Sequence, residues 1–258
     1  MLLFFPKQEV KKKTPVVLYT HGGGWGGGDK YKILKRPFLS ALKQILDQGI
    51  ACAVIEYRLT RKEISTAFDC VIDCKDAARF LMKKSEEFNL DVDRMGVWGG
   101  SAGGHLALMT GLASNDLFVG APELKSYTPF FKCIVSFYPM VTFTKPELNE
   151  GSNFSKPSRF ISMLGGPLKD NMELARNLSP VEHLHKSSPP ILLVHGDQDD
   201  ILPVAQSHYF VEIAEREKSN VKYIEVKGAK HSFGGNDISP TMEEINNATA
   251  IFIIEHLN

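Results

Sequence analysis

Short apolar runs alternate with longer segments of helical periodicity along most of this 258-residue chain. Runs of about four to eight apolar residues, such as 16–19, are typical of strands that are buried on both faces of a parallel sheet. Segments whose apolar residues recur every three or four positions, such as 68–88, indicate amphipathic helices. The pattern predicts strands at 16–19, 50–57, 95–98, 133–137, 191–195 and 221–226, and helices at 37–46, 68–88, 105–112, 204–217 and 241–257.

Strands that alternate with helices predict an α/β fold with a mostly parallel central sheet flanked by helices. In such sheets, functional groups gather at the carboxyl ends of the strands. Residues 139–190 interrupt the alternation with several prolines and little periodicity. A long irregular stretch inside a compact domain is usually functional. We therefore expect one domain over 1–258, in which 139–190 is an insertion or cap over the site.

Composition and charge narrow the possible functions. The chain has 30 basic and 30 acidic residues, so no overall field would attract nucleic acid or an anionic membrane. The run 11–13, three lysines, is interpreted as a solvated loop.

The four cysteines lack zinc or redox spacing, so we expect no metal and no cofactor, and they fit a reducing compartment. The apolar N-terminus lacks the basic segment of a signal peptide. A cytoplasmic protein, a secreted one with a preceding leader, and a homodimer all stay open.

The strongest chemical motif is a G-x-S-x-G match centred on Ser101, between a predicted strand and a predicted helix. That context is the one a nucleophile elbow requires, because a sharp strand-to-helix turn exposes the serine hydroxyl. The flanking glycines are expected where the backbone is crowded. Ser101 is therefore the candidate nucleophile.

A glycine-rich loop follows the first strong strand and reads HGGGWGGGDK from residue 21. Loops of this type present backbone N–H groups to a developing oxyanion. We expect Gly23 and Gly24 to donate from this loop and Ala102 to donate from the elbow. The alternatives are a plain turn or a phosphate loop, and the lysine and hydroxyl residue of a P-loop do not follow.

Two further motifs could complete a hydrolase triad. The strand at 191–195 is followed by three aspartates, Asp197, Asp199 and Asp200, any of which could orient a histidine. His231 lies in the loop after the strand at 221–226 and is the candidate base. The chain order serine, aspartate, histidine is the order expected for an α/β-hydrolase.

Taken together, these motifs resemble the esterase/lipase group of α/β-hydrolases. The resemblance rests on HGGGWGGGDK, EYRL at 56–59, VWGGSAGGHLA at 97–107, LGGP at 164–167, HGDQDDILP at 195–203 and GAKHSF at 228–233. Acetyl-xylan and feruloyl-type carboxylesterases are the most similar members, and hormone-sensitive-lipase-like esterases are more distant. In that group the triad acid follows the histidine by four residues, which implies Asp199. The resemblance also implies that Trp25 and Tyr57 border the substrate pocket.

The combined interpretation is a serine carboxylesterase that acts on a small-molecule or oligosaccharide ester. Acetyl or feruloyl esters of plant cell-wall polysaccharides are the expected substrates, by resemblance. A kynurenine-formamidase-like amide hydrolase is the alternative enzyme, and a non-catalytic binding module is the alternative of another class. A peptidase would need an additional propeller or a larger lid, for which this length leaves no room.

Overall fold

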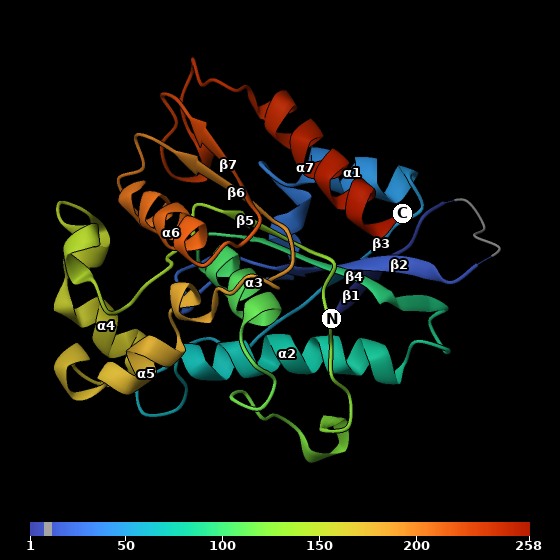
Figure 1. The fold of residues 1–258 in the computed structure, drawn as a ribbon, viewed down its shortest axis with the longest axis horizontal. Helices are drawn as coiled ribbons and strands as arrows, with labels where there is room; N and C mark the ends of the chain where they lie inside the picture. The colour runs from blue at the N-terminus through green and yellow to red at the C-terminus, as the bar shows by residue number, and fades with distance from the viewer. Residues whose placement is uncertain (8–11) are drawn as a thin grey trace.

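The computed structural model describes residues 1–7 and 12–258, and its strands form one seven-stranded sheet (Figure 1). The sheet order is β1-β3-β2-β4-β5-β6-β7, and every neighbouring pair is parallel except β1 with β3. The strands are β1 (Leu2–Phe4), β2 (Thr14–Thr20), β3 (Ala51–Val54), β4 (Leu90–Gly100), β5 (Cys133–Phe137), β6 (Ile191–Gly196) and β7 (Val221–Val226). The predicted fold class, an α/β-hydrolase fold, is confirmed. Lys11 of the predicted lysine loop lies outside the described residues.

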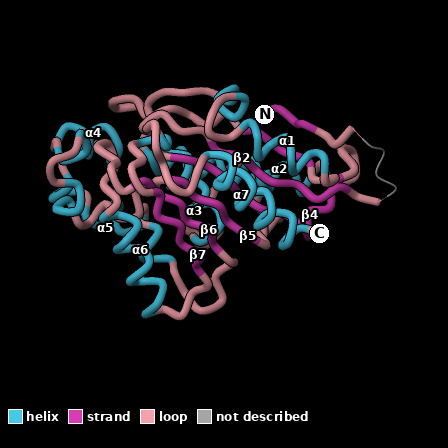
Figure 2. The backbone as a smooth tube through the Cα atoms, turned by 90° about the horizontal axis from the view of Figure 1, so that it is seen from above, coloured by secondary structure: helices cyan, strands magenta, loops and turns pink. Residues whose placement is uncertain are grey.

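Helices cover both faces of this sheet (Figures 1 and 2). They are α1 (Leu39–Asp47), α2 (Ala67–Lys83), α3 (Ala102–Leu112), α4 (Pro157–Leu164), α5 (Met172–Asn177), α6 (Ala205–Arg216) and α7 (Met242–Leu257). Side chains of β2 alternate between two cores: Val16 and Leu18 pack with α2, α3 and α6, whereas Val17 and Tyr19 pack with α1 and α7. This alternation follows from the two-residue period of a strand. Burial on both faces explains the uninterrupted apolar run.

The segment 139–190 contains more regular structure than its sequence indicates. It holds α4 and α5, which Figures 1 and 2 place at one end of the molecule. It also holds four short 3₁₀ helices: Pro146–Asn149, Asn153–Ser155, Leu168–Asp170 and Pro180–His183. Pro157 occupies the first turn of α4, and Gly165 ends it in the left-handed conformation with φ of 79°. Both are ordinary helix boundary signals, so the expectation of little regular structure is wrong here.

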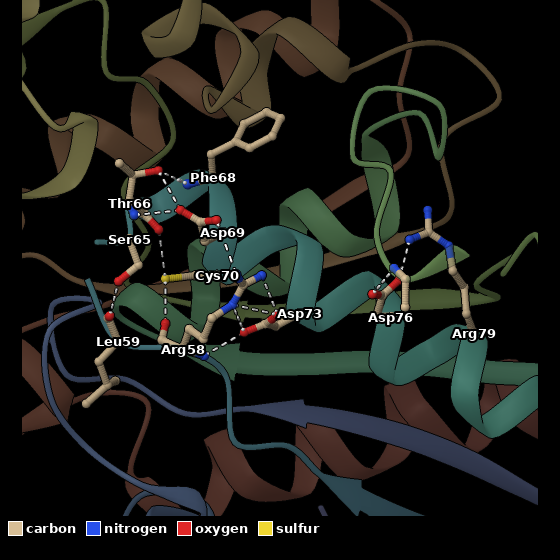
Figure 3. Close-up of polar contacts among 11 residues, drawn as sticks. Arg58, Leu59, Ser65, Thr66, Phe68, Asp69, Cys70, Asp73, Asp76 and Arg79 are labelled. Atoms are coloured by element: carbon tan, nitrogen blue, oxygen red, sulfur yellow. Dashed lines mark hydrogen bonds and ion pairs between the residues drawn. The ribbon is translucent and has the colours of Figure 1, made fainter. Parts of the chain in front are cut away.

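The loop between β3 and α2 is attached to α2 through charged side chains (Figure 3). The Arg58 guanidinium binds both carboxylate oxygens of Asp73, with Nε to Oδ2 at 2.9 Å and Nη2 to Oδ1 at 2.8 Å among its hydrogen bonds. The helix itself begins with a capping box, in which Thr66 and Asp69 exchange side-chain and backbone hydrogen bonds. Such caps satisfy N–H groups that the first helical turn leaves free. Tyr57 belongs to this loop, so the attachment holds that part of the chain against the core.

No helix in the described part of the chain is both long and apolar enough to span a lipid bilayer.

Candidate active site

Ser101 sits at the sharp turn between β4 and α3. Its backbone has φ of 60° and ψ of −127°, a conformation that L-residues rarely adopt. A Cβ on Gly99 would lie 2.3 Å from the carbonyl oxygen of Gly103, and a Cβ on Gly103 would lie 2.1 Å from that of Thr20. The two glycines therefore let β4, α3 and β2 approach closely enough to form the turn. The result is a serine held in a strained position at the end of a central strand.

The structure brings the three predicted triad residues into one hydrogen-bonded chain. The Oγ of Ser101 lies 3.0 Å from Nε2 of His231, and Nδ1 of His231 lies 2.7 Å from Oδ2 of Asp199. Ser101 and His231 are half-buried, whereas the Asp199 side chain is fully buried. With the Nδ1–H donated to Asp199, Nε2 is free to accept the serine proton. This geometry suits general-base activation of a hydroxyl.

Asp199 is held as a carboxylate by several donors. Its Oδ1 accepts the backbone N–H groups of Ile201 and Leu202, both at 2.9 Å. Its Oδ2 lies 2.7 Å from Nδ1 of His231 and 3.3 Å from Nε2 of His195. Burial alone would raise the pKa of this carboxyl, but the interactions with His195 and His231 outweigh burial and hold that pKa well below its usual range. Asp199 is therefore ionised and able to stabilise a protonated His231.

The other two aspartates of this motif have different surroundings. Asp197 accepts the backbone N–H of Gly228 at 2.7 Å and so joins the loop after β6 to the loop after β7. Asp200 is exposed. Of the three aspartates that the sequence offers as the triad acid, only Asp199 is hydrogen-bonded to His231.

The three expected oxyanion donors lie beside Ser101. Gly23 and Gly24 line the same cavity as Ser101, and Ala102 is the first residue of α3. Within the described residues, no hydrogen bond occupies the N–H groups of Gly23, Gly24 or Ala102. Unoccupied N–H groups at a loop and at a helix N-terminus favour negative charge.

Trp25 and Tyr57 do not border the cavity, contrary to the expectation from family resemblance. Trp25 is fully buried, and its indole Nε1–H donates to Nδ1 of His105 at 3.1 Å. Tyr57 is also buried, and its hydroxyl donates to the carbonyl oxygen of His21 at 2.7 Å. Both rings lie behind the glycine loop and support it from the protein interior. The loop is thus positioned by aromatic side chains that are buried beneath it.

His105 links this loop to two other parts of the fold. Besides accepting from Trp25, it donates through Nε2 to the carbonyl oxygen of Leu178 at 2.8 Å. Burial lowers the pKa of His105 to about 4, so the ring is neutral at ordinary pH. A neutral ring is the form that can accept at Nδ1 and donate at Nε2. His105 therefore connects the glycine loop, α3 and the 139–190 segment.

A cavity of about 480 Å³ opens above Ser101 and His231. Tyr138, Phe38 and Ile201 form apolar parts of its wall, and Phe154 of the 139–190 segment forms another. Tyr138 also packs edge-on against the His231 ring, with centroids 4.7 Å apart. Volumes of about 300–1,000 Å³ are usual for small-ligand sites.

Several residues of this cavity carry no signal in the sequence motifs. Lys32, Lys35, Arg36 and Arg159 line its wall, although none belongs to a catalytic motif. The first three follow the glycine loop by only a few residues. Proximity to that loop is the signal that could have found them. Arg159 comes from α4, whose position over the cavity depends on tertiary structure.

Comparisons with known proteins find a matching family and several similar esterases. The sequence model of the BD-FAE family matches residues 1–213. Esterase LipC of Mycobacterium tuberculosis is 28% identical over 232 residues, which cover 86% of this chain and 54% of LipC. The chain thus spans about half the length of the curated relatives it matches.

Solved structures show the same fold. The butyrate-bound structure of Est2, an esterase from Thermogutta terrifontis, has a TM-score of 0.79 and 21% identity, covering 98% of this chain and 87% of that one. A truncated carbohydrate esterase from gut microbiota has a TM-score of 0.77 and 18% identity, covering 97% and 90%. The resemblance to the esterase/lipase group of α/β-hydrolases is confirmed.

Proposed function

This chain belongs to the BD-FAE family, and from that premise we propose that it is a serine carboxylic ester hydrolase that cleaves short acyl esters. The observation that carries the proposal is the hydrogen-bonded chain from Ser101 through His231 to Asp199 at the floor of a cavity. Relatives described as esterases support the same reaction class.

The proposed first step is acylation of Ser101. His231 accepts the Ser101 proton at Nε2 as Oγ attacks the ester carbonyl carbon, and Asp199 stabilises the resulting imidazolium. The N–H groups of Gly23, Gly24 and Ala102 donate to the carbonyl oxygen as it becomes an oxyanion. His231 then passes its proton to the alcohol oxygen as the bond between that oxygen and the carbonyl carbon breaks. The alcohol departs, and the acyl group stays bonded to Ser101.

The proposed second step is hydrolysis of the acyl-enzyme. His231 accepts a proton from a water molecule, and the hydroxide attacks the same carbonyl carbon. Collapse of the second tetrahedral intermediate releases the carboxylic acid, and the proton returns from His231 to Ser101. No group beyond these residues is needed for either step.

Acetyl or feruloyl esters of plant cell-wall polysaccharides are the substrates that we propose for this site. Two neighbours support this choice: Est2 is described with propionate and butyrate bound, and another neighbour is described as a carbohydrate esterase.

Hydrolysis of p-nitrophenyl acetate, butyrate and octanoate, with Ser101→Ala as the control, tests the reaction class. We expect kcat/KM to fall as the acyl chain lengthens, and we expect the variant to lose at least about a thousandfold. Retention of more than a few per cent of activity by Ser101→Ala would overturn the role of this serine.

Three natural-type substrates then separate the specific alternatives. Acetate or ferulate release from substituted xylo-oligosaccharides would support the polysaccharide ester. Faster cleavage of N-formylkynurenine would favour the amide hydrolase instead. Lack of turnover on every ester and amide would favour a binding module.

A further inference from the structure

The wall of the cavity above Ser101 carries a net positive charge, whereas the whole chain has a formal net charge of zero. Four basic side chains line it, Lys32, Lys35, Arg36 and Arg159, and none of the aspartates or glutamates that the structure describes lines it. The chain as a whole has equal numbers of basic and acidic residues. The excess of positive charge is therefore local to the site.

The four cations come from two separate parts of the fold. Lys32 belongs to the 3₁₀ helix Lys30–Leu34 that follows the glycine loop, and Lys35 and Arg36 come directly after it. Arg159 belongs to α4, in the segment between β5 and β6, which Figure 1 shows at one end of the molecule. Its guanidinium carbon lies 5.3 Å from the centre of the Phe154 ring, a cation–π contact that positions it at the wall.

These cations have no carboxylate partner within 4.0 Å among the described residues, whereas the nearby Lys30 does. Lys30, two positions before Lys32, binds Glu56 at 2.7 Å. The carboxylate of the proposed triad, Asp199, is fully buried behind His231 and occupied by its own donors. Lys35, Arg36 and Arg159 are exposed, so their donors are open to a bound molecule.

We infer that the ester accepted by this site carries an anionic oxygen group, a carboxylate or a phosphate, close to the bond that is cleaved. The inference rests on the proposed ester hydrolase function and restricts the proposed acetyl or feruloyl esters to those that also carry such a group, as on an acidic sugar. Arginine and lysine are the side chains that recognise such groups, arginine through its planar pair of donors. Clefts lined by one sign of charge also raise the local concentration of the oppositely charged substrate.

The expected effect of each cation follows from Coulomb's law. One unit charge at roughly 8 Å in a water-like dielectric changes an equilibrium by about twofold, and several charges multiply. We therefore expect wild-type kcat/KM to be about tenfold higher for an anionic ester than for its neutral counterpart at low salt. Raising the ionic strength from roughly 0.01 to 0.5 M should remove most of that preference.

The test compares 4-acetoxybenzoate and 4-acetoxyphenyl phosphate with neutral 4-acetoxybenzamide. Lys35→Gln, Arg36→Gln and Arg159→Gln should each lower the anionic-to-neutral ratio of kcat/KM about two- to threefold, and the triple variant should bring it near one. Lys43→Gln is the matched control, because Lys43 is exposed on α1 and is not part of the cavity wall. The two anionic esters reveal whether carboxylate or phosphate is preferred.

A binding measurement separates failure of this inference from failure of the proposed function. Calorimetry with Ser101→Ala compares 4-acetamidobenzoate with 4-acetamidobenzamide, which hold an amide in place of the ester. Tighter binding of the charged compound, lost in the triple variant, supports the inference even if no ester is turned over. Equal binding of both compounds, or a kcat/KM ratio that does not respond to salt and to the three substitutions, overturns it.

Discussion

Replacing His105 with asparagine tests how burial of a neutral imidazole makes this fold sensitive to acid. His105 is fully buried, accepts from Trp25 and donates to Leu178. Its pKa is about 4 in the folded protein and 6.5 when unperturbed. Between these values the unfolded chain binds a proton that the native chain does not, so native stability falls as pH falls from 6.5 to 4.

The size of this effect follows from the pKa difference. Since one pKa unit corresponds to 1.36 kcal/mol, a shift of this size corresponds to a loss of about 3 kcal/mol between pH 7 and pH 4. Asparagine cannot titrate, and its side-chain oxygen can accept near the position of Nδ1. The variant leaves the Leu178 carbonyl without its partner, which costs about 1–3 kcal/mol at every pH. The substitution should therefore lower stability at pH 7 and flatten its dependence on pH.

Urea unfolding of wild type and His105→Asn at pH 7, 6, 5 and 4 measures both the free energy of unfolding at pH 7 and its dependence on pH. Wild-type stability minus variant stability should decrease by about 3 kcal/mol across this range, so a gap of about 1–3 kcal/mol at pH 7 should close or reverse by pH 4. Trp25→Phe is the control, because it removes the other hydrogen bond of His105, the one donated by Trp25, yet keeps the titrating ring, and so should keep the wild-type slope. Parallel pH dependences for wild type and His105→Asn would refute the reasoning.

Three further predictions concern other parts of the structure. Asp199→Asn should lower kcat/KM for p-nitrophenyl acetate by about 10⁴, with an unchanged circular dichroism spectrum, because His231 loses the carboxylate that orients it. A double-mutant cycle with Arg58→Ala and Asp73→Ala should give a coupling energy of about 1 kcal/mol in urea unfolding, because the pair is bidentate but partly exposed; a coupling indistinguishable from zero would contradict this. Hydrogen bonds from Lys227 and His208 lower the pKa of Glu225 to about 2, so the stability lost in Glu225→Gln should be present above pH 4.5 and vanish as pH falls through about 2; an acid titration of Tm that shows a constant difference would exclude it.

The elements that sequence predicts well are those whose signals are local. The strand, turn and helix around Ser101 lie within a few consecutive residues, and the glycines that allow the turn are part of the same motif. The buried strands are also local signals, because an apolar run reports burial on both faces. β4 begins at Leu90, earlier than predicted, because the polar residues Asp91, Asp93 and Arg94 interrupt the apolar run in its first half.

The errors arise where a position depends on distant partners or on short elements. The burial of Trp25 depends on His105, which is 80 positions away in sequence. The sequence near the loop therefore does not tell whether the Trp25 ring faces the cavity or the protein interior. α4 and α5 have eight and six residues, too few for helical periodicity to be evident. The cationic wall needs Arg159 to approach the glycine loop, and only the tertiary fold brings them together.

Covalent labelling of Ser101 tests the central claim most directly. Paraoxon should transfer its diethyl phosphoryl group to a serine that is activated by a neighbouring base, and peptide mass spectrometry then locates the added mass. We predict stoichiometric labelling on Ser101 that parallels the loss of p-nitrophenyl acetate hydrolysis, slows markedly in Asp199→Asn and is absent in Ser101→Ala. Label on another residue, or full inhibition of the esterase without label on Ser101, would contradict the proposed mechanism.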